Sequence, residues 1–233
     1  MKNELEFLEK YGKENWYLWN KNKLILQNLK TRFAVHKKVK ILDLGCGAGH
    51  LALDLTLAGF DVCAADIDNA AILYTSKKNI KIIDLRRNKI KSKHDVIICA
   101  DVIEHVANDF SFIRELKQKL NRGGLLIITV PALMRLWSQH DIRLGHYRRY
   151  KLKELKKTLH RLGFSVIKIR YWNFVALPFV LLCRNYFNKN ATRHEFALLP
   201  SPINFILKKL LLIEQKLEFP LGTSIFVIAK NGS

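Results

Sequence analysis

Short apolar segments that alternate with helical segments constrain the fold of this chain more than any other feature. The apolar segments are rich in Val and Ile, and several end at aspartate or glycine. A helical pattern or a turn separates each one from the next. This alternation is typical of crossover units in a mainly parallel sheet that helices cover on both faces. We predict strands over 39–44, 61–65, 80–83, 95–99, 125–130, 165–169 and 224–229.

Helical patterns fill the intervals between these strands. They run over 50–57, from about residue 69, over 109–120 and over 151–162, and an N-terminal pattern is interrupted at Gly12. We therefore expect an α/β, doubly wound sheet of seven strands. No Pro/Gly/Ser-rich linker or internal repeat divides the chain, which predicts a single domain over 1–233. It would carry N-terminal helices over 1–35 and a helical insertion over about 172–221, between the sixth and seventh strands.

The strongly positive charge of the chain favours an anionic partner but does not show which kind of anion binds. Forty Lys and Arg against twenty Asp and Glu give a formal net charge of +20. Such a charge attracts nucleic acid, anionic lipid headgroups or phosphorylated substrates. The lysines are spread along the whole chain, so a general lysine-rich composition explains the charge equally well.

Cysteine spacing and hydropathy predict a cytoplasmic protein. Four cysteines lie far apart without a CxxC pair, so the sequence supports neither a zinc knuckle nor a redox motif and favours reduced thiols. The N-terminus lacks the basic-then-apolar layout of a secretory signal. The longest uncharged apolar stretch, 172–183, is shorter than the roughly 20 residues of a membrane-spanning helix.

A glycine-rich turn, Gly45-Cys46-Gly47-Ala48-Gly49, follows the first predicted strand. Ligands of open parallel sheets bind at the carboxyl ends of the strands, and glycines let a ligand approach the backbone there. Asp66 ends the second strand, where a carboxylate can accept hydrogen bonds from both hydroxyls of a ribose. These features fit any cofactor that contains a nucleoside.

The details of the turn favour S-adenosylmethionine (SAM) over a dinucleotide. The dinucleotide fingerprint is G-x-G-x-x-G, but here the third glycine comes one position early and His50 stands where that fingerprint has glycine. Asp43 lies just before the glycines. Its carboxylate would repel a pyrophosphate and attract the ammonium and sulfonium groups of SAM.

Four motifs in order resemble a known family. Residues 41–49, ILDLGCGAG, are similar to the first motif of class I SAM-dependent methyltransferases, and Asp66 matches their acidic ribose ligand. Residues 95–106, DVIICADVIEHV, resemble the fourth-strand motif of the subgroup that includes ubiquinone-biosynthesis O-methyltransferases. Residues 120–124 are similar to the glycine turn of that subgroup. The resemblance covers about residues 14–171 and implies a Rossmann-like fold.

The resemblance also implies a set of cofactor contacts. Asp66 and Ile67 would hold the ribose and adenine, and Asp84 or Leu85 would border the adenine, although Arg86-Arg87 departs from the family's acidic pattern there. The residues expected around the rest of the cofactor are Asp43, Gly45, Cys46, Gly47, Gly49 and Asp101.

Acidic and histidine side chains after the fourth strand are candidates for the chemistry. In related families an acidic-x-x-Glu-His group binds a divalent cation, and a later histidine completes the site. The matching metal ligands here are Asp101, Glu104, His105 and His146, with His140 as the alternative later histidine. Such a set suits Mg²⁺, Mn²⁺ or Zn²⁺, which lowers the pKa of a bound hydroxyl. Alternatively, Glu104 and His105 only open the next helix. We take Glu104, His105 and His146 as the catalytic candidates.

Two further segments bear on the acceptor. The loop over 131–150 is rich in aromatic, histidine and arginine residues, and Arg148 and Arg149 either clamp a phosphate or carboxylate or serve packing and surface charge. The apolar insertion either covers a greasy substrate or lies on an anionic membrane surface, or it is a helical cap or a dimer contact. We expect methyl transfer to oxygen of a small, lipid-linked or quinone-like acceptor, with an RNA 2′-O-methyltransferase as the alternative.

Overall fold

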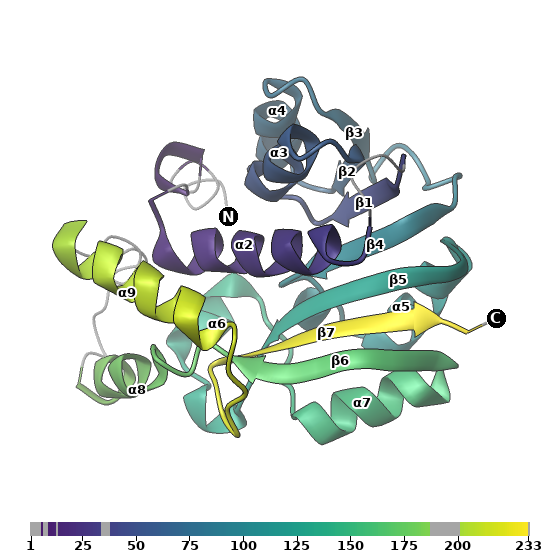
Figure 1. Cartoon of the computed structure of the whole chain (residues 1–233). Coiled ribbons are helices and arrows are strands. Elements are labelled where there is room, and N and C mark those ends of the chain that lie inside the picture. Colours follow the sequence, from purple (N-terminus) through teal and green to yellow (C-terminus); the bar gives the residue numbers. More distant parts are fainter. Residues whose placement is uncertain (1–5, 7–8, 13, 34–37, 187–200, 233) are drawn as a thin grey trace.

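The computed structural model describes residues 6, 9–12, 14–33, 38–186 and 201–232 (Figure 1). Parts of the predicted N-terminal helices (1–35) and of the predicted insertion (172–221) lie outside these residues.

The described chain forms one seven-stranded sheet with the strand order β3-β2-β1-β4-β5-β7-β6. Strand β7 runs antiparallel to both of its neighbours, β5 and β6, and the other neighbours are parallel. The predicted doubly wound α/β fold class is therefore confirmed. The strands are β1 (Lys40–Leu44), β2 (Asp61–Asp66), β3 (Lys81–Asp84), β4 (His94–Ala100), β5 (Leu120–Pro131), β6 (Phe164–Trp172) and β7 (Ser224–Asn231).

Helices cover both faces of the sheet because strand side chains alternate between the faces. Ile41 of β1 belongs to the core layer that also contains residues of α2 (Trp16–Lys30) and α3 (His50–Leu57). The next residue, Leu42, belongs to the opposite layer, which contains residues of α5 (Asp109–Gln118) and α7 (Leu152–Arg161). Helix α4 (Asn69–Ser76) lies beside β2 and β3 (Figure 1). Both cores are continuous apolar layers, as a buried parallel sheet requires.

Two local expectations were wrong. The fifth strand begins at Leu120, not at 125, because Leu120 pairs with His94 and the Gly123–Gly124 pair lies inside β5. The segment 131–150 is not an irregular loop, because it contains the short 3₁₀ helix η2 (Met134–Leu136) and the helix α6 (Gln139–Leu144). A similar short helix, η1 (Ile103–His105), follows β4. A capping box at Ser138 and Asp141 begins α6.

Two helices, α8 (Leu177–Tyr186) and α9 (Ser201–Glu214), lie between β6 and β7. Helix α9 lies beside α2, where Leu211 packs with Trp16 and Ala176 in a small third core (Figure 1). The buried Glu214 carboxylate accepts backbone hydrogen bonds from Phe174 and Val175, each 2.9 Å long, ahead of α8. Within the described residues, no helix combines the length and the apolar composition needed to cross a membrane.

We expect Glu214→Gln to lower the free energy of unfolding. The amide keeps one acceptor but turns an N–H₂ group toward a backbone N–H, which costs about 1–3 kcal/mol for a buried unsatisfied pair. Urea denaturation measures this loss. The exposed Glu218→Gln is the matched control, and an equal loss in both variants would contradict the capping role of Glu214.

Candidate functional site

The turn after β1 requires glycine at its first and last positions. Gly45, Gly47 and Gly49 have φ angles of 71°, 53° and 75°, in the left-handed region. A Cβ at Gly45 would lie 2.5 Å from Val102 Cγ2, and one at Gly49 would lie 2.5 Å from Thr75 Oγ1. The turn is therefore pressed against the chain that follows β4 and against α4, and it leaves a narrow backbone cradle.

Asp43 provides an unpaired carboxylate oxygen beside this cradle. Its side chain is buried, and Asp43 Oδ2 has no hydrogen-bond partner. Burial raises the pKa of Asp43 to about 7; the Lys21 ammonium opposes the rise and Asp66 adds to it. A buried acceptor without a partner fits a cationic ligand group such as the ammonium of SAM.

Asp66 ties the glycine turn to the end of β2. Its Oδ2 accepts a hydrogen bond from Gly47 N at 2.9 Å, and its Oδ1 accepts from Ile67 N at 2.7 Å and from Asp68 N at 3.0 Å. A carboxylate has about four lone-pair positions, so acceptor capacity remains for a ribose hydroxyl. The neighbouring Ile67 side chain is 62% exposed, which offers an apolar surface for a flat ring.

The third strand contributes less than the sequence suggests. Asp84 lies opposite Asp66 in the β2–β3 register, but the Arg86 guanidinium donates to both Asp84 oxygens, at 2.9 and 2.6 Å. Leu85 donates its backbone N–H to Asp66 O at 2.9 Å and packs against the core. Arg86 and Arg87 therefore engage the Asp84 carboxylate. Of the two candidates for contact with the adenine, Leu85 lies in the better position, because it is hydrogen-bonded to Asp66.

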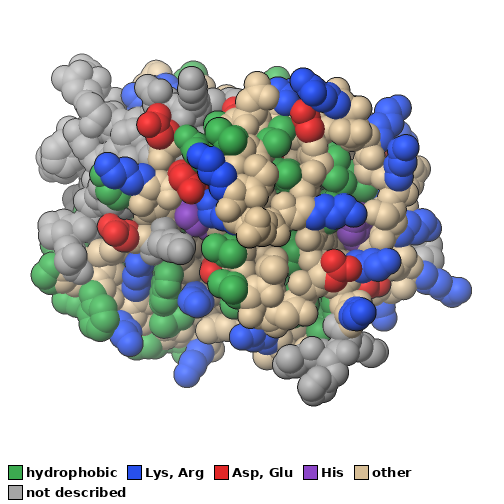
Figure 2. All heavy atoms as spheres, turned by 90° about the horizontal axis from the view of Figure 1, so that it is seen from above, with side chains coloured by type: hydrophobic (Ala, Val, Ile, Leu, Met, Phe, Trp, Pro, Cys, Tyr) green, Lys and Arg blue, Asp and Glu red, His purple; other side chains and the backbone are tan. Residues whose placement is uncertain are grey.

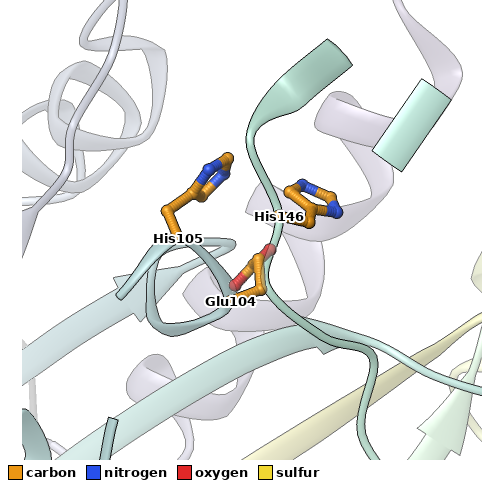
Figure 3. A group of neighbouring side chains, drawn as sticks. All are labelled: Glu104, His105 and His146. Carbon is orange, nitrogen blue, oxygen red and sulfur yellow. The ribbon is translucent and has the colours of Figure 1, made fainter. Parts of the chain in front are cut away.

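Glu104, His105 and His146 converge at the exit from β4 (Figure 3). Their candidate ligand atoms all lie within 4.8 Å of one another, and the two imidazole rings meet edge to face with centroids 4.6 Å apart. Glu104 is fully buried, and neither of its carboxylate oxygens has a hydrogen-bond partner. A buried carboxyl group with two unpaired oxygens, beside two imidazoles, fits a bound cation or a transferable proton.

The surroundings of this group change its protonation. Burial raises the pKa of Glu104 well above its usual range, the nearby Asp101 charge adds to the rise, and Lys21 opposes it. Desolvation lowers the pKa of His105, and the neighbouring His146 imidazole lowers it further. These shifts favour a neutral His105 at neutral pH and make the Glu104 carboxylate, once ionised, a stronger base than an exposed glutamate.

Asp141 orients the His146 ring. His146 Nδ1 lies 3.1 Å from Asp141 Oδ1, and the Arg149 guanidinium donates to the same oxygen from Nε at 2.8 Å. Asp141 is fully buried, and the His146 side chain is only 8% exposed. With Nδ1 as the donor, Nε2 carries the lone pair, as in carboxylate–histidine–metal arrangements.

The structure does not bring Asp101 or His140 into this group. Asp101 Oδ2 accepts hydrogen bonds from Lys21 Nζ at 2.8 Å and from Tyr17 OH at 3.0 Å, and Oδ1 accepts from Thr129 Oγ1 at 2.8 Å. Both oxygens thus have partners from α2 and β5. His140 is exposed on α6. Among the described residues, the histidine that joins Glu104 and His105 is therefore His146.

Of the two alternatives for Arg148 and Arg149, a clamp for an anion or internal packing, the structure shows internal contacts. Arg149 is buried and donates to Asp141 and to the Ala132 carbonyl. Arg148 pairs with Asp109 at 2.9 Å and donates to the Ala107 carbonyl. Both guanidinium groups therefore hold the segment 145–150 in place, as the packing alternative predicts.

Sequence reasoning missed three residues that shape the site: Lys21, Tyr17 and Asp141. Lys21 is buried in α2 one turn before the buried Leu24 and Ile25, and a lysine at such a position was the one available signal for a buried partner. The five-residue separation of Asp141 and His146 has no regular helical meaning, so no periodicity could reveal their contact.

The chain belongs to the methyltransferase domain family, whose model matches residues 16–169. With its fold and motifs it is a class I SAM-dependent methyltransferase. The ubiquinone biosynthesis O-methyltransferase of Rickettsia prowazekii (strain Madrid E) is 36% identical over 153 residues, which cover 55% of this chain. The match spans 58% of that relative's length.

Solved structures share the fold at low identity. The magnesium protoporphyrin IX methyltransferase of Synechocystis PCC 6803 with bound SAM aligns with a TM-score of 0.56 at 17% identity, over 90% of this chain and 77% of that one. A SAM-dependent methyltransferase of Archaeoglobus fulgidus aligns with a TM-score of 0.54 at 18% identity, over 90% and 94%. These likenesses concern the fold alone, so the acceptor has to be argued from the site.

We expect SAM affinity to fall as the pH decreases from about 7.5 to about 5.5, a range in which most of the SAM amine is protonated. Asp43 must be ionised to pair with the ammonium, and burial raises its pKa to about 7, so acid increasingly protonates it in the free protein. Calorimetric titration of SAM across this range measures the effect. Asp43→Asn should bind SAM more weakly at about pH 7.5 and lose this dependence; an unchanged dependence would assign it to another group.

Proposed function

We propose that this chain transfers the methyl group of SAM to an oxygen of a small, lipid-linked or quinone-like acceptor, and that residues 1–233 form a single methyltransferase domain. One observation carries the proposal: the buried Glu104 carboxyl, with both oxygens unpaired, faces His105 and His146 at the strand edge that also bears the glycine turn. Methyl transfer to a hydroxyl needs a group that accepts its proton, and Glu104 has that capacity.

The cofactor half would be held by residues of β1 and β2. Bound SAM supplies an electrophilic methyl group. Asp43 would pair with its ammonium, the Gly45–Gly49 backbone with Cys46 and Gly47 would surround its methionine part, and Asp66 with Ile67 would hold the ribose and adenine. Leu85 would border the adenine, and Asp84 would support it through Arg86. Asp101 would act indirectly near Asp43, through the Lys21 ammonium that it pairs with. The in-line displacement would require bound SAM and acceptor to exclude water from this site.

On the acceptor side, Glu104 would accept the hydroxyl proton. Burial raises its pKa, so the ionised carboxylate is a stronger base than an exposed one. Asp141 would act through His146, keeping its ring oriented toward the acceptor. His105, neutral at physiological pH, would donate or accept a hydrogen bond at the same oxygen.

We further propose that Glu104, His105 and His146 hold a divalent cation. One carboxylate with two imidazoles suits Zn²⁺ or Mn²⁺, and the orientation of His146 by Asp141 supports this. A bound cation lowers the pKa of a coordinated hydroxyl. Asp101 is left out of the ligand set because Lys21, Tyr17 and Thr129 occupy its oxygens.

The name of the Rickettsia relative supports an oxygen atom and a quinone-like acceptor. The net charge of +20 instead favours RNA, and an RNA 2′-O-methyltransferase is the second candidate.

The exposed face of α9 supports a lipid-linked acceptor. Ile203, Ile206, Leu210 and Ile213 follow helical spacing and are each 44–57% exposed, while Leu211 on the opposite side is buried against α2. A helix that is apolar on both sides needs a second apolar environment. Figure 2 shows hydrophobic side chains beside Lys and Arg side chains at its lower left, where α9 lies.

The net charge of the protein favours an anionic membrane over a second copy of the chain as the partner of the exposed face of α9. Pairing two copies that each carry +20 brings like charges together, whereas an anionic bilayer attracts them, at about 1 kcal/mol for each cation near the surface. We therefore propose that the protein is cytoplasmic and that α9 lies on the anionic inner face of the membrane. This orientation is independent of the methyl transfer itself.

Glu104→Gln should lower kcat by roughly 10²–10⁴-fold, since the amide cannot accept the proton. Labelled SAM is incubated with total lipid extract and, separately, with total RNA, and label transfer is counted. SAM affinity should stay unchanged, and the exposed Glu115→Gln is the control. Label in RNA alone would reject the lipid-linked acceptor. Activity that EDTA leaves unchanged would reject the cation while leaving Glu104 as the base.

Ile206→Gln combined with Leu210→Gln should weaken sedimentation with phosphatidylglycerol-containing vesicles at least about tenfold, because two apolar side chains lose their burial in lipid. The control replaces Leu57 and Leu73, which are exposed leucines of α3 and α4, with Gln. Equal weakening in the control, or a wild-type protein that ignores vesicles and runs as a dimer, would contradict membrane docking through α9.

A further inference from the structure

A basic hollow lies at the opposite end of the sheet from the glycine turn. It is an open hollow of about 550 Å³ between α5, the end of α7 and the start of β5, and it reaches Asn231 at the end of β7. Because β7 is antiparallel, its end meets the beginnings of β5 and β6. In Figure 1 this end lies at the right, beside the C-terminus. The hollow is thus separate from Glu104 and from the cofactor turn.

Five cations line the hollow without a carboxylate among its lining residues. These are Lys93, Arg114, Lys117, Arg122 and Arg161. Within the described part of the chain, none of the five forms an ion pair. Figure 2 shows many Lys and Arg side chains along the same right-hand edge of the molecule. Like charges that converge on one hollow create a positive potential that an anion would relieve.

Neighbouring groups orient these cations without neutralising them. The Arg161 guanidinium lies 5.5 Å from the centre of the Phe110 ring, and Lys117 Nζ lies 5.8 Å from that of Phe164. The acidic residue of the adjoining hollow, which Arg122 also borders, is Asp95. Its carboxylate accepts hydrogen bonds from Asn121 Nδ2 at 2.7 Å and from Lys40 N at 3.0 Å.

We propose that this hollow binds a compact anion with several phosphate groups, such as a polyphosphate or a small molecule that carries one. Its volume lies in the range of small-molecule sites, about 300–1,000 Å³. Three arginines can each hold phosphate oxygens through a two-pronged guanidinium contact, and the lysines add point charges. The cations surround one concavity, which suits a compact ligand better than the extended track that a nucleic acid strand needs. The binding is additional to the methyl transfer and does not depend on it.

The probe is inorganic triphosphate, titrated calorimetrically into the full chain at low salt. The triple variant Arg114→Gln, Arg122→Gln and Arg161→Gln should bind at least about tenfold more weakly. The matched control removes three charges from the exposed side of α7, at Lys153, Lys156 and Lys157, and should change affinity by no more than about twofold. SAM affinity should be unchanged in both, which also reports that both are folded.

A conservative variant separates charge from geometry. Arg161→Lys keeps the charge but loses the guanidinium fork, so triphosphate binding should weaken several-fold while the fold is retained. No binding of triphosphate to the wild type, or equal weakening by the α7 control, would overturn the proposal. A single-stranded RNA that bound more tightly than triphosphate through the same arginines would replace the compact ligand with a nucleic acid.

Discussion

The parallel pairing of β1 with β4 is the constraint on which the rest of the site depends. Leu44 lies opposite Cys99, so both strands leave the sheet at the same level and their following segments meet at one edge. The glycine turn then presses against Val102, where a single added methyl group would overlap. The backbone pairing of β1 with β4 therefore brings the glycine turn close to Glu104, the candidate proton acceptor.

That arrangement gathers several carboxyl groups in a buried space, which would be unstable without a compensating cation. Lys21 supplies it: its ammonium pairs with Asp101 and lowers the pKa values of Asp43 and Glu104 against the larger effect of burial. Helix α2 is therefore part of the site as well as a cover for the sheet. Helix α2 thus contacts the site through Lys21 and contacts α9 through Trp16, which packs with Leu211.

The segment after β5 shows how a buried ion pair can specify the geometry of the candidate site. Arg149 and His146 share the Asp141 carboxylate, and the Tyr147 N–H donates to the Glu104 carbonyl at 2.8 Å. These contacts join α6 and the chain ahead of α7 to η1. This network of hydrogen bonds holds His146 beside Glu104 and His105, although His146 lies 41 positions after His105 in the sequence.

The sequence by itself determined the alternating strands and helices, the glycine turn and the identity of Asp43 and Asp66 as carboxylates at strand ends. These follow from backbone periodicity and from the steric freedom of glycine, which act over a few residues. Only the tertiary structure decided that β7 inserts antiparallel between β5 and β6, that His146 and not His140 joins Glu104, and that Asp101 turns to Lys21 and Tyr17. Those choices depend on which buried polar groups satisfy one another across distant segments, and no local spacing encodes such a competition.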